Sequence, residues 1–495
     1  MKGSKVFIYI LLILVFGICL FTCLDLKDTE IPYDDAYSAF MIKSSYSDIM
    51  HTTAKDVHPP LYYWGLKTFS LLFGDSIFAL RLFSLLGVFF TLLLGCFPIR
   101  RFFGDRVAIF FIILMIIFPV TQYLATDIRM YSWTMFFVLA CALSAFDIFI
   151  NEKIRGWFLF FLSGICAAYL HNYGLLSVFG IYACLFVSLI LNKKKWQYLV
   201  LCGVLFSLAY LPWLFQLISQ FGDVAGDYWI NPLTINDLFL HIYYFYSPKD
   251  IWLPFTDFTK GQMMVWLIII MFIQLVLTLK AITASLKEKD RTKNLVIISF
   301  LAFLFPVIAG GLISFISVPI LVTRYMTCSF GLFVLSLAFV LAKVSEYSIY
   351  RKLSYIFFTL LFTIGGVRAY SGLKHYSEVE IAYNRMREFS KSDNNEHVFV
   401  VNDFSYHVVP RLQLIVPDNE YYVLDKGKYE NFEPFIFKNT DSVRFDRYIL
   451  VHQERGAIQE EFRMYQIELL KQNMIIDSLH VLDIYLYKVE AKATP

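Results

Sequence analysis

The segment IPYDDAYSAF, residues 31–40, places two carboxylates side by side, Asp34 and Asp35, with Tyr37 close behind them. A carboxylate within hydrogen-bond reach of a hydroxyl can take its proton while a new bond forms. A second carboxylate beside it raises the pKa of the first by like-charge repulsion. A lone acidic pair in a loop is usually solvated and inert, so its meaning depends on the charged residues that accompany it.

Further ionisable side chains lie next to long apolar stretches, where charge is expensive and is a functional candidate. They are His58 and Lys67 in DVHPPLYYWGLK, Asp127 and Arg129 in ATDIRMYSW, His171 in YLHNYG, and Arg324 with Tyr325 in LVTRYM. Taken singly, His58, His171 and Lys67 are typical of turn or packing residues, and the others of interfacial charges. Together they put carboxylates and guanidiniums on one face of a membrane. That pattern indicates a site that holds an anionic group beside a carboxylate base.

The chain as a whole is too apolar for a soluble protein. Of its 495 residues 58% are hydrophobic and only 17% are charged, whereas a soluble protein of this length needs far more polar surface. Its apolar stretches have the length of a helix that crosses a bilayer and lack the alternation of a membrane barrel. We expect a polytopic α-helical membrane protein with about eleven spans. Their approximate limits are 6–24, 78–98, 107–125, 131–150, 157–171, 173–191, 197–218, 262–280, 294–315, 325–342 and 353–370.

The charge of the connecting loops predicts the orientation of the spans, because short cytoplasmic loops carry an excess of Lys and Arg. With the N-terminus in the cytoplasm, the loops on that side contain most of the bases near the spans, and the opposite loops contain mainly carboxylates. These bases are Arg100, Arg101, Arg106, Lys153, Arg155, Lys193, Lys194, Lys195, Lys280, Lys287, Lys289, Arg291, Lys293, Lys343, Arg351 and Lys352. The loop 25–77, which carries the Asp pair, is therefore expected on the extracytoplasmic side.

Residues 373–495 differ in composition from the transmembrane module expected over 1–372. The segments HVFVVND and RYILVHQ are typical of short buried strands, AIQEEFRMYQIELLKQ of a helix with one apolar face, and HVLDIYLYKVE of an edge strand. We expect a small soluble α/β domain, which an odd number of spans places outside the cell membrane. The eight cysteines lie in or beside apolar stretches, and their spacing indicates neither a zinc site nor a disulfide framework.

Several of these motifs, in their order and spacing, resemble a known family. PYDDAYSAF, HPPLYYWGLKTFSLLFGDSIFALRLFSLL, RFFGDRVAIF, DIRMYSW, YLHNYGLL and TRYM resemble bacterial members of the protein mannosyltransferase and aminoarabinose transferase superfamily. The resemblance covers roughly the first 340 residues. It implies a GT-C fold and transfer of a sugar from a polyprenyl-phosphate donor. For the C-terminal domain it implies no function.

The resemblance also implies roles for individual residues. The signature acidic pair of the family, usually Asp-Glu, falls on Asp34 and on Asp35, which here replaces the Glu. Asp127 falls on a second acidic position. The expected reaction uses Asp34 as the general base, supported by the other two carboxylates, and inverts the anomeric carbon. The leaving lipid phosphate needs cations, and the expected binding residues are Arg129, Arg324, Tyr325, Arg81 and Lys67, with His58, Tyr37 and His171 as further candidates.

The expected partners are a polyprenyl-phosphate-linked sugar donor, an acceptor that is a lipid, a glycan or a protein, and the membrane lipids, but no nucleic acid. The expected location is the bacterial inner membrane. Paired aspartates also suit Mg²⁺ or Mn²⁺, but no further ligand set is evident, so a metal cofactor stays open.

Two other classes of function compete with a transferase. A transporter or flippase of lipid-linked glycans would place charges near the middle of its spans and often repeats itself in two halves. Here the spans are nearly free of such charges, Asp147 being the nearest exception, and no repeat is evident. A scaffold that only presents the C-terminal domain would leave the charges on the outer face without a role.

Overall fold

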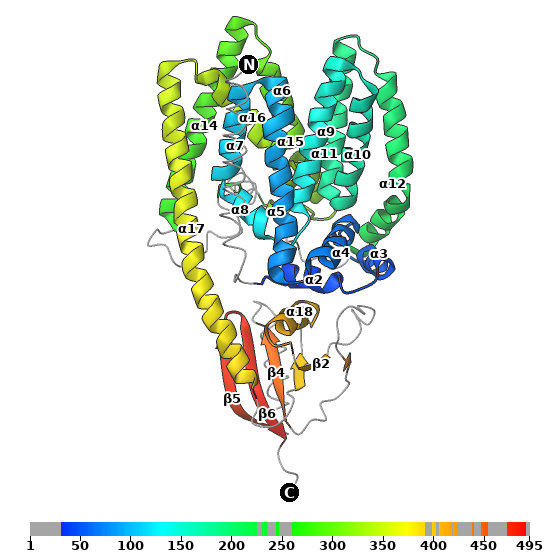
Figure 1. Ribbon diagram of the computed structural model, residues 1–495, viewed down its shortest axis with the longest axis vertical. Helices are drawn as coiled ribbons and strands as arrows, with labels where there is room; N and C mark the ends of the chain where they lie inside the picture. Colours follow the sequence, from blue (N-terminus) through cyan, green and yellow to red (C-terminus); the bar gives the residue numbers. More distant parts are fainter. Residues whose placement is uncertain are drawn as a thin grey trace. The chain divides into compact units, whose positions relative to one another are not determined.

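The computed structural model describes residues 31–224, 230, 232–234, 244–246, 260–391, 398–401, 405–417, 419–423, 438–439, 447–453 and 473–491. The chain divides into two units, and Figure 1 colours it along the sequence from blue to red. The first unit comprises Met1–Lys27 and Met50–Ser371, and the second comprises Asp28–Ile49 and Gly372–Pro495. The predicted span 6–24 lies outside the described residues.

The first unit is built of helices. Two short helices precede the long ones: α3 (Tyr46–Lys55), whose residues up to Ile49 belong to the second unit, and α4 (Leu61–Phe73). The others are α5 (Ile77–Leu94), η1 (Gly95–Ile99), α6 (Arg100–Phe103), α7 (Asp105–Ile117), α8 (Pro119–Thr126), α9 (Tyr131–Asn151), α10 (Ile154–Leu170), α11 (Asn172–Leu191), α12 (Gln197–Val224), α14 (Lys260–Glu288), α15 (Thr292–Ile316), η2 (Thr323–Ser329) and α16 (Phe330–Val344). Helices α9, α10 and α11 lie side by side (Figure 1).

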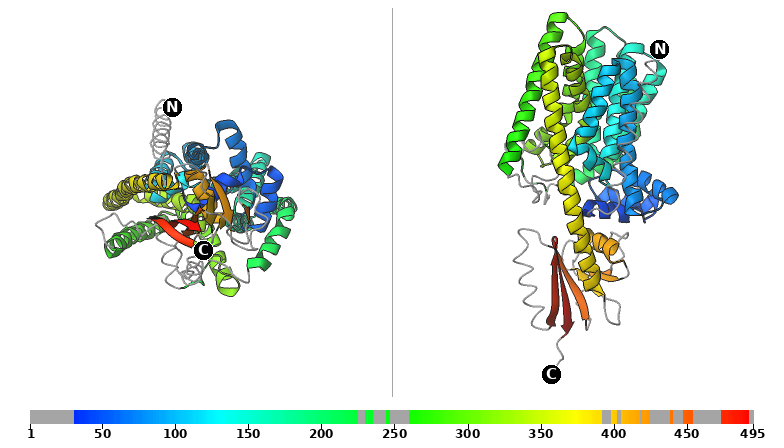
Figure 2. Two further views of the ribbon diagram at one scale, coloured as in Figure 1. Left: turned by 90° about the horizontal axis from the view of Figure 1, so that it is seen from below. Right: turned by 60° about the vertical axis from the view of Figure 1, so that its left-hand side comes forward.

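Seven helices among the described residues are long and apolar enough to cross a membrane, and the pair α7–α8 makes an eighth if it counts as one span. The chain is therefore a multi-pass helical membrane protein, as predicted. The count of about eleven spans is not confirmed. Helix α10 has only 17 residues. Helix α17 (Ser348–Ser390) replaces the predicted span 353–370 with a helix of 43 residues, drawn as one ribbon in the right-hand view of Figure 2.

The predicted span 107–125 is broken. Helices α7 and α8 meet at Phe118 and are bent by 67° relative to one another. Phe118 has an extended backbone, with φ −68° and ψ 123°, and Pro119 is the first residue of α8. A proline lacks an amide hydrogen and disfavours the helical conformation of the residue before it. The predicted segment is therefore not one straight helix, because α7 ends before Phe118 and α8 begins at Pro119.

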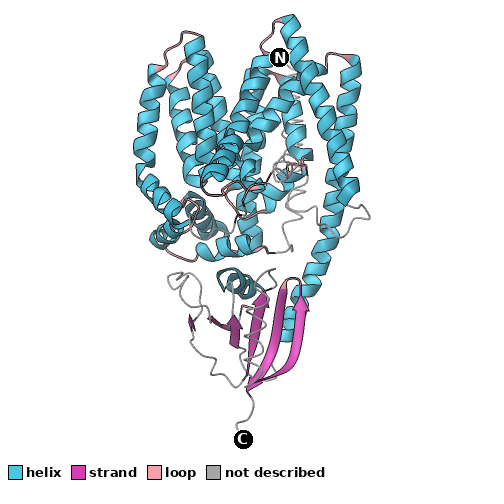
Figure 3. Ribbon diagram, turned by 180° about the vertical axis from the view of Figure 1, so that it is seen from behind, coloured by secondary structure: helices cyan, strands magenta, loops and turns pink. Residues whose placement is uncertain are grey.

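The second unit contains a six-stranded sheet. In spatial order the strands are β3 (Lys438–Asn439), β2 (Glu420–Val423), β1 (Val398–Val401), β4 (Arg447–Gln453), β6 (Ile484–Ala491) and β5 (Asn473–Val481). The first four are parallel, whereas β4 with β6 and β6 with β5 are antiparallel. Helix α18 (Ser405–Ile415) connects β1 to β2, as a parallel pair requires. Figure 3 shows these strands in magenta.

The sheet has an apolar core on one face. Phe399, Val401, Ile449 and Leu486 point into it, together with residues of α18 and of the last turns of α17. Val400 and Leu450 belong to a smaller cluster, as the alternation along a strand requires.

The predicted strands in HVFVVND and RYILVHQ are confirmed as β1 and β4. The predicted edge strand in HVLDIYLYKVE is wrong. Its chain turns at Leu482 and Asp483, so that β6 lies between β4 and β5 and is not at an edge. The left-handed backbone of Leu482, with φ 55°, makes the tight turn between two antiparallel strands. The helix predicted in AIQEEFRMYQIELLKQ lies outside the described residues.

The acidic segment belongs to the second unit. Helix α2 (Tyr33–Met41) carries Asp34 and Asp35 in its first turn, where carboxylates are favoured by the helix dipole. The first backbone hydrogen bond of this helix runs from the Ala36 amide to the Pro32 carbonyl, at 2.9 Å. The segment 28–49 thus groups with residues 372–495 and not with the spans.

A close helix contact in the first unit predicts a strong effect of one methyl group. A Cβ atom at Gly174 would lie 2.2 Å from the Ala167 carbonyl oxygen, whereas one at Gly366 would meet nothing within 4 Å. We expect Gly174→Ala to destabilise the protein by about 1–3 kcal/mol, because α10 and α11 must move apart. The control Gly366→Ala should be stabilising by roughly 0.5–1 kcal/mol. Thermal unfolding in detergent measures both, and equal midpoints for Gly174→Ala and wild type would contradict the contact.

Candidate active site

The polar residues of the first unit gather where its helices end. Asp127 follows the last residue of α8, and its carbonyl accepts from the Arg129 amide at 2.7 Å in a tight turn before α9. His171 separates α10 from α11. Arg324 and Tyr325 lie in the 3₁₀ helix η2. Backbone groups at such ends are not used by a helical ladder and can pair with side chains.

Arg129 and Tyr63 form a buried contact between α4 and the turn before α9. The Arg129 Nη1 donates to the Tyr63 hydroxyl oxygen at 3.1 Å. Both side chains are buried, as is that of Asp127. A guanidinium buried in this way is held in a fixed direction, and it is the side chain best suited to a planar anion such as a phosphate.

His171 lies at the centre of a ring cluster. The ring centroid of His171 is 5.2 Å from that of His58, 5.4 Å from that of Tyr131 and 4.8 Å from that of Tyr325. The side chain is only 1% exposed. The sequence motifs containing His58, Tyr131, His171 and Tyr325 are therefore brought together by the fold.

The hydrogen bond of His171 defines its charge state. Its Nδ1 accepts from the Tyr173 amide at 3.0 Å and so caps α11. An accepting Nδ1 carries no hydrogen, so the ring is neutral and its Nε2 bears the proton. Burial of this residue between the two helices, followed by the positive charges of Arg129 and Arg324, lowers the pKa of His171 to about 3. Both guanidiniums thus act on the same ring.

A second set of contacts holds the chain before η2. The Tyr173 hydroxyl donates to the Ile320 carbonyl at 3.0 Å. The Ser314 hydroxyl oxygen accepts from the amides of Ile320 and Leu321, each at 2.9 Å. A Cβ at Gly310 would lie 2.2 Å from the Tyr173 hydroxyl oxygen, so glycine makes room for it. These contacts fix the backbone segment that leads to Arg324.

The proline-rich segment is fixed to the same junction. The Asn172 side-chain amide donates to the Val57 carbonyl at 3.0 Å, one residue before His58. This bond fixes the segment beside His58, whose ring centroid lies 5.2 Å from that of His171. The reading of His58 and His171 as isolated packing residues is incomplete, because the two rings meet in one polar cluster.

The remaining predicted residues lie elsewhere. Arg81 is buried on α5, and Lys67 is half-buried on α4. Asp34, Asp35 and Tyr37 lie on α2 in the second unit. Asp35 is 1% exposed, whereas Asp34 is half-buried, as expected for successive residues that point about 100° apart on a helix. The pairing of Asp34 with the cations of the first unit stays a prediction.

The sequence did not predict which tyrosine side chains belong to the site. Tyr63, Tyr131 and Tyr173 make contacts within the cluster, but none was singled out beforehand. All three lie inside the motifs that contain His58, Asp127 and His171. The available signal was their closeness in the sequence to those residues. Aromatic residues are so frequent in this chain that this closeness does not distinguish the tyrosines of the site from the others.

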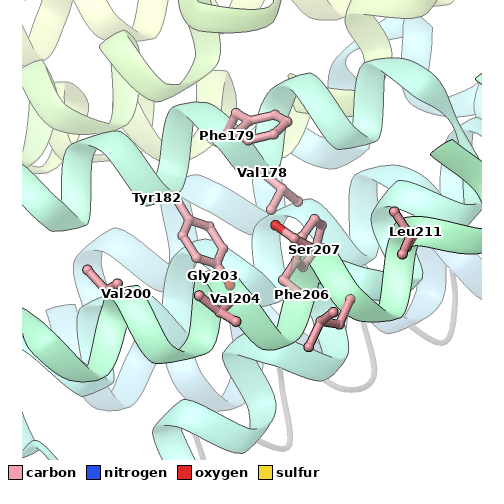
Figure 4. Close-up of a pocket in the computed structure, with 10 residues that line it drawn as sticks. Val178, Phe179, Tyr182, Val200, Gly203, Val204, Phe206, Ser207 and Leu211 are labelled. Atoms are coloured by element: carbon pink, nitrogen blue, oxygen red, sulfur yellow. The ribbon is translucent and has the colours of Figure 1, made fainter. Parts of the chain in front are cut away.

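Among the described residues, neither a group of metal ligands nor a cavity adds side chains to this site. Within the described ranges no three His, Cys, Asp or Glu side chains are placed to share a metal ion. A cavity of about 420 Å³ between α11 and α12 has Tyr182 and Ser207 as its polar side chains (Figure 4). Larger cavities of about 880, 840 and 650 Å³ also lie among the described helices, and no predicted site residue lines any of the four.

The neutral state of His171 predicts a pH dependence of stability. The ring has an ordinary pKa near 6.5 in the unfolded chain and about 3 in the folded chain. Below pH 6.5 the unfolded chain binds a proton that the folded chain does not, so stability falls by up to about 1.4 kcal/mol per pH unit as pH falls towards 3. His171→Asn keeps an N-cap side chain but removes this proton. Its melting temperature should therefore fall less than that of wild type between pH 7 and 5.

The control for this experiment is His51→Asn, at an exposed position of α3. It should follow the pH dependence of wild type. Parallel melting curves for wild type and His171→Asn over this pH range would refute the neutral, buried state of His171.

Comparison with known proteins supports the fold. Residues 57–174 match the family model described as dolichyl-phosphate-mannose-protein mannosyltransferase. This range contains His58, Lys67, Arg81, Asp127, Arg129 and His171. A comparison with curated proteins gives no match.

Solved structures of ArnT from Cupriavidus metallidurans are similar along the whole chain. The apo structure has a TM-score of 0.60 at 12% identity, with 96% of this chain and 97% of ArnT covered. The structure bound to undecaprenyl phosphate has a TM-score of 0.56 at 11% identity, with the same coverage of 96% and 97%. The predicted resemblance is therefore confirmed: the chain has the GT-C fold of ArnT, and residues 57–174 match the mannosyltransferase family.

Proposed function

We propose that this protein is an integral-membrane glycosyltransferase that moves a sugar from a polyprenyl-phosphate donor to an acceptor hydroxyl on the extracytoplasmic side. The observation that carries the proposal is the cluster of buried Arg129, His171 and Tyr325 with partly buried Arg324 at the helix ends. The fold supports it, because ArnT has been crystallised with undecaprenyl phosphate.

The cations of the cluster fit a leaving phosphate. A polyprenyl phosphate departs with its negative charge, so it needs stabilisation by fixed positive charge more than it needs an acid. Arg129 is buried and Arg324 is partly buried, and both act electrostatically on His171. In such a low-dielectric surrounding, a guanidinium forms strong, charge-assisted hydrogen bonds to phosphate oxygens. Arg81 and Lys67 lie outside this cluster, on α5 and α4, so their part in binding the phosphate stays a prediction.

The neutral His171 adds polarity without charge. Because its Nδ1 is used by the Tyr173 amide, only its Nε2–H is available to a ligand. We assign it the role of a hydrogen-bond donor and not of a proton acceptor. Because its pKa is so low, the ring at neutral pH lacks the second proton that a general acid would release, and its protonated Nε2 has no lone pair to accept one.

The acceptor hydroxyl needs a base, and Asp34 is the proposed one. A carboxylate that takes this proton while the anomeric carbon is attacked opposite the leaving phosphate gives inversion. Asp35, its neighbour on α2, would then raise the proton affinity of Asp34 by like-charge repulsion. A supporting role of Asp127 in this reaction stays a prediction. Sugar and acceptor identity, whether lipid, glycan or protein, are not fixed by these residues.

Replacement of the proposed base should abolish turnover without unfolding the protein. We expect Asp34→Asn to lower turnover of a polyprenyl-phosphate sugar about 10²- to 10⁴-fold, because an amide cannot accept the proton. Asp48→Asn is the matched control, since Asp48 is an exposed carboxylate on the neighbouring helix α3. Both variants should elute and melt like wild type. Full turnover of Asp34→Asn would eliminate Asp34 as the base.

Replacement of Arg324 tests the phosphate site separately. A hydrogen bond to a charged group contributes about 1.5–3 kcal/mol, so Arg324→Ala should weaken binding of undecaprenyl phosphate about 10- to 100-fold. Arg155→Ala, at an exposed position at the start of α10, should leave binding unchanged. Titration of the purified protein with undecaprenyl phosphate measures both. Equal affinity for wild type and Arg324→Ala would mean that Arg324 serves only to anchor η2.

A further inference from the structure

Helix α2 is held by the soluble sheet unit through one buried charged group. Arg411 lies on α18 and is 2% exposed. Its Nη1 donates to the Asp483 Oδ1 at 2.8 Å and to the Tyr33 hydroxyl oxygen at 3.1 Å. The Tyr33 hydroxyl in turn donates to the Asp483 Oδ2. Three elements that are far apart in the sequence, α2, α18 and the β5–β6 turn, thus meet at one guanidinium.

Two further contacts tie the same segment to the sheet unit. The guanidinium carbon of Arg411 lies 5.1 Å from the centroid of the Tyr33 ring, within the range of a cation–π contact. The Ile31 amide donates to the Tyr383 hydroxyl at 3.0 Å, and the Ile31 side chain packs against the sheet core. Tyr383 belongs to the last turns of α17. The chain is therefore fixed on both sides of Pro32, immediately before the acidic pair.

Helix α2 has little stability of its own. It has nine residues, and Pro32 provides no side-chain cap. Isolated helices of this length are unstable in water, so α2 depends on tertiary contacts. Tyr33 is its first residue, and each following residue points about 100° further around the axis. Fixing Tyr33 therefore sets the direction in which Asp34 points.

We propose that the sheet unit is a functional part of the acidic site, because it holds α2 in a fixed orientation, and that Arg411 is the positioning residue for the carboxylate of Asp34. This inference rests on the proposed function for the role of Asp34, but the holding of α2 by Arg411 is independent of it. The C-terminal domain is then more than an appendage that follows the transmembrane helices.

The charge pair explains why one substitution should release the helix. Arg411 is buried, whereas the Asp483 side chain is 35% exposed. Removing the guanidinium leaves the Asp483 carboxylate and the Tyr33 hydroxyl without their common donor. The sheet itself keeps its ladder hydrogen bonds. The expected result is a local release of α2 and not unfolding of the unit.

The first experiment measures hydrogen exchange of the full-length protein in detergent. Arg411→Ala should increase exchange of the amides in residues 33–41 at least tenfold and leave β1 and β4 at wild-type rates. Tyr33→Phe, which removes only the hydroxyl, should give a smaller increase in the same residues. Arg411→Lys keeps the charge but has only one nitrogen that can donate hydrogen bonds. Its exchange rates in residues 33–41 should lie between those of wild type and Arg411→Ala.

The matched control is Arg447→Ala. Arg447 pairs with Glu490 at 2.7 Å on the same sheet, but its side chain is 74% exposed and it has no described contact with α2. It should leave exchange in residues 33–41 unchanged. Wild-type exchange of these residues in Arg411→Ala would overturn the proposal. If Arg411→Ala also loosens β1 and β4, Tyr33→Phe decides: wild-type exchange of α2 in that variant overturns it as well.

The second experiment connects α2 to turnover. Arg411→Ala should lower kcat for a polyprenyl-phosphate sugar at least tenfold with little change in the KM for that donor, because Asp34 is mispositioned while the phosphate site is intact. Arg411→Lys should restore part of the loss. Loss of α2 protection with unchanged kcat would overturn the positioning role. If Asp34→Asn itself retains turnover, the base assignment fails, and the exchange result still decides whether Arg411 holds α2.

Discussion

Polar groups among membrane-spanning helices have no bulk water to pair with, so they must find partners within the protein. The first unit meets this constraint by placing its polar side chains at helix ends. Asp127 follows α8, His171 caps α11, and Arg324 lies in η2. The bend at Phe118 belongs to the same arrangement, since the short helix α8 begins after it and ends at Thr126, directly before Asp127. The positions of the cations, the neutral histidine and their tyrosine partners all follow from where these helices stop.

The two units contribute different chemistry to the proposed reaction. The transmembrane unit supplies fixed cations in a low-dielectric surrounding, which suits a lipid phosphate. The sheet unit supplies α2 and its carboxylates, which suit a hydroxyl acceptor. Such a division separates recognition of the lipid carrier from activation of the acceptor.

The sequence was sufficient for features that depend on local pattern. Apolar length predicted the helices, and strand alternation predicted β1 and β4. The motifs around Asp127 and His171 predicted a polar site. The missed features depend on pairs distant in the sequence. Tyr33 and Arg411 are 378 residues apart, so no local signal places α2 with the sheet. The bend at Phe118 had a local signal in Pro119, but the apolar pattern on both sides concealed it. The turn at Leu482 was also missed, because the alternation of apolar and polar residues continues through it.

The distribution of cysteine gives the two units different redox behaviour. The six described cysteines are free and lie in the transmembrane unit, and the sequence has no cysteine in residues 28–49 or 372–495. The sheet unit is therefore stabilised by packing, strand hydrogen bonds and ion pairs such as Arg411–Asp483, with no disulfide to form or to lose. Oxidants that form and reshuffle disulfides outside the cytoplasm have no substrate in this unit. Its folding is thus independent of thiol oxidoreductases, and a single introduced cysteine would be its sole reactive thiol.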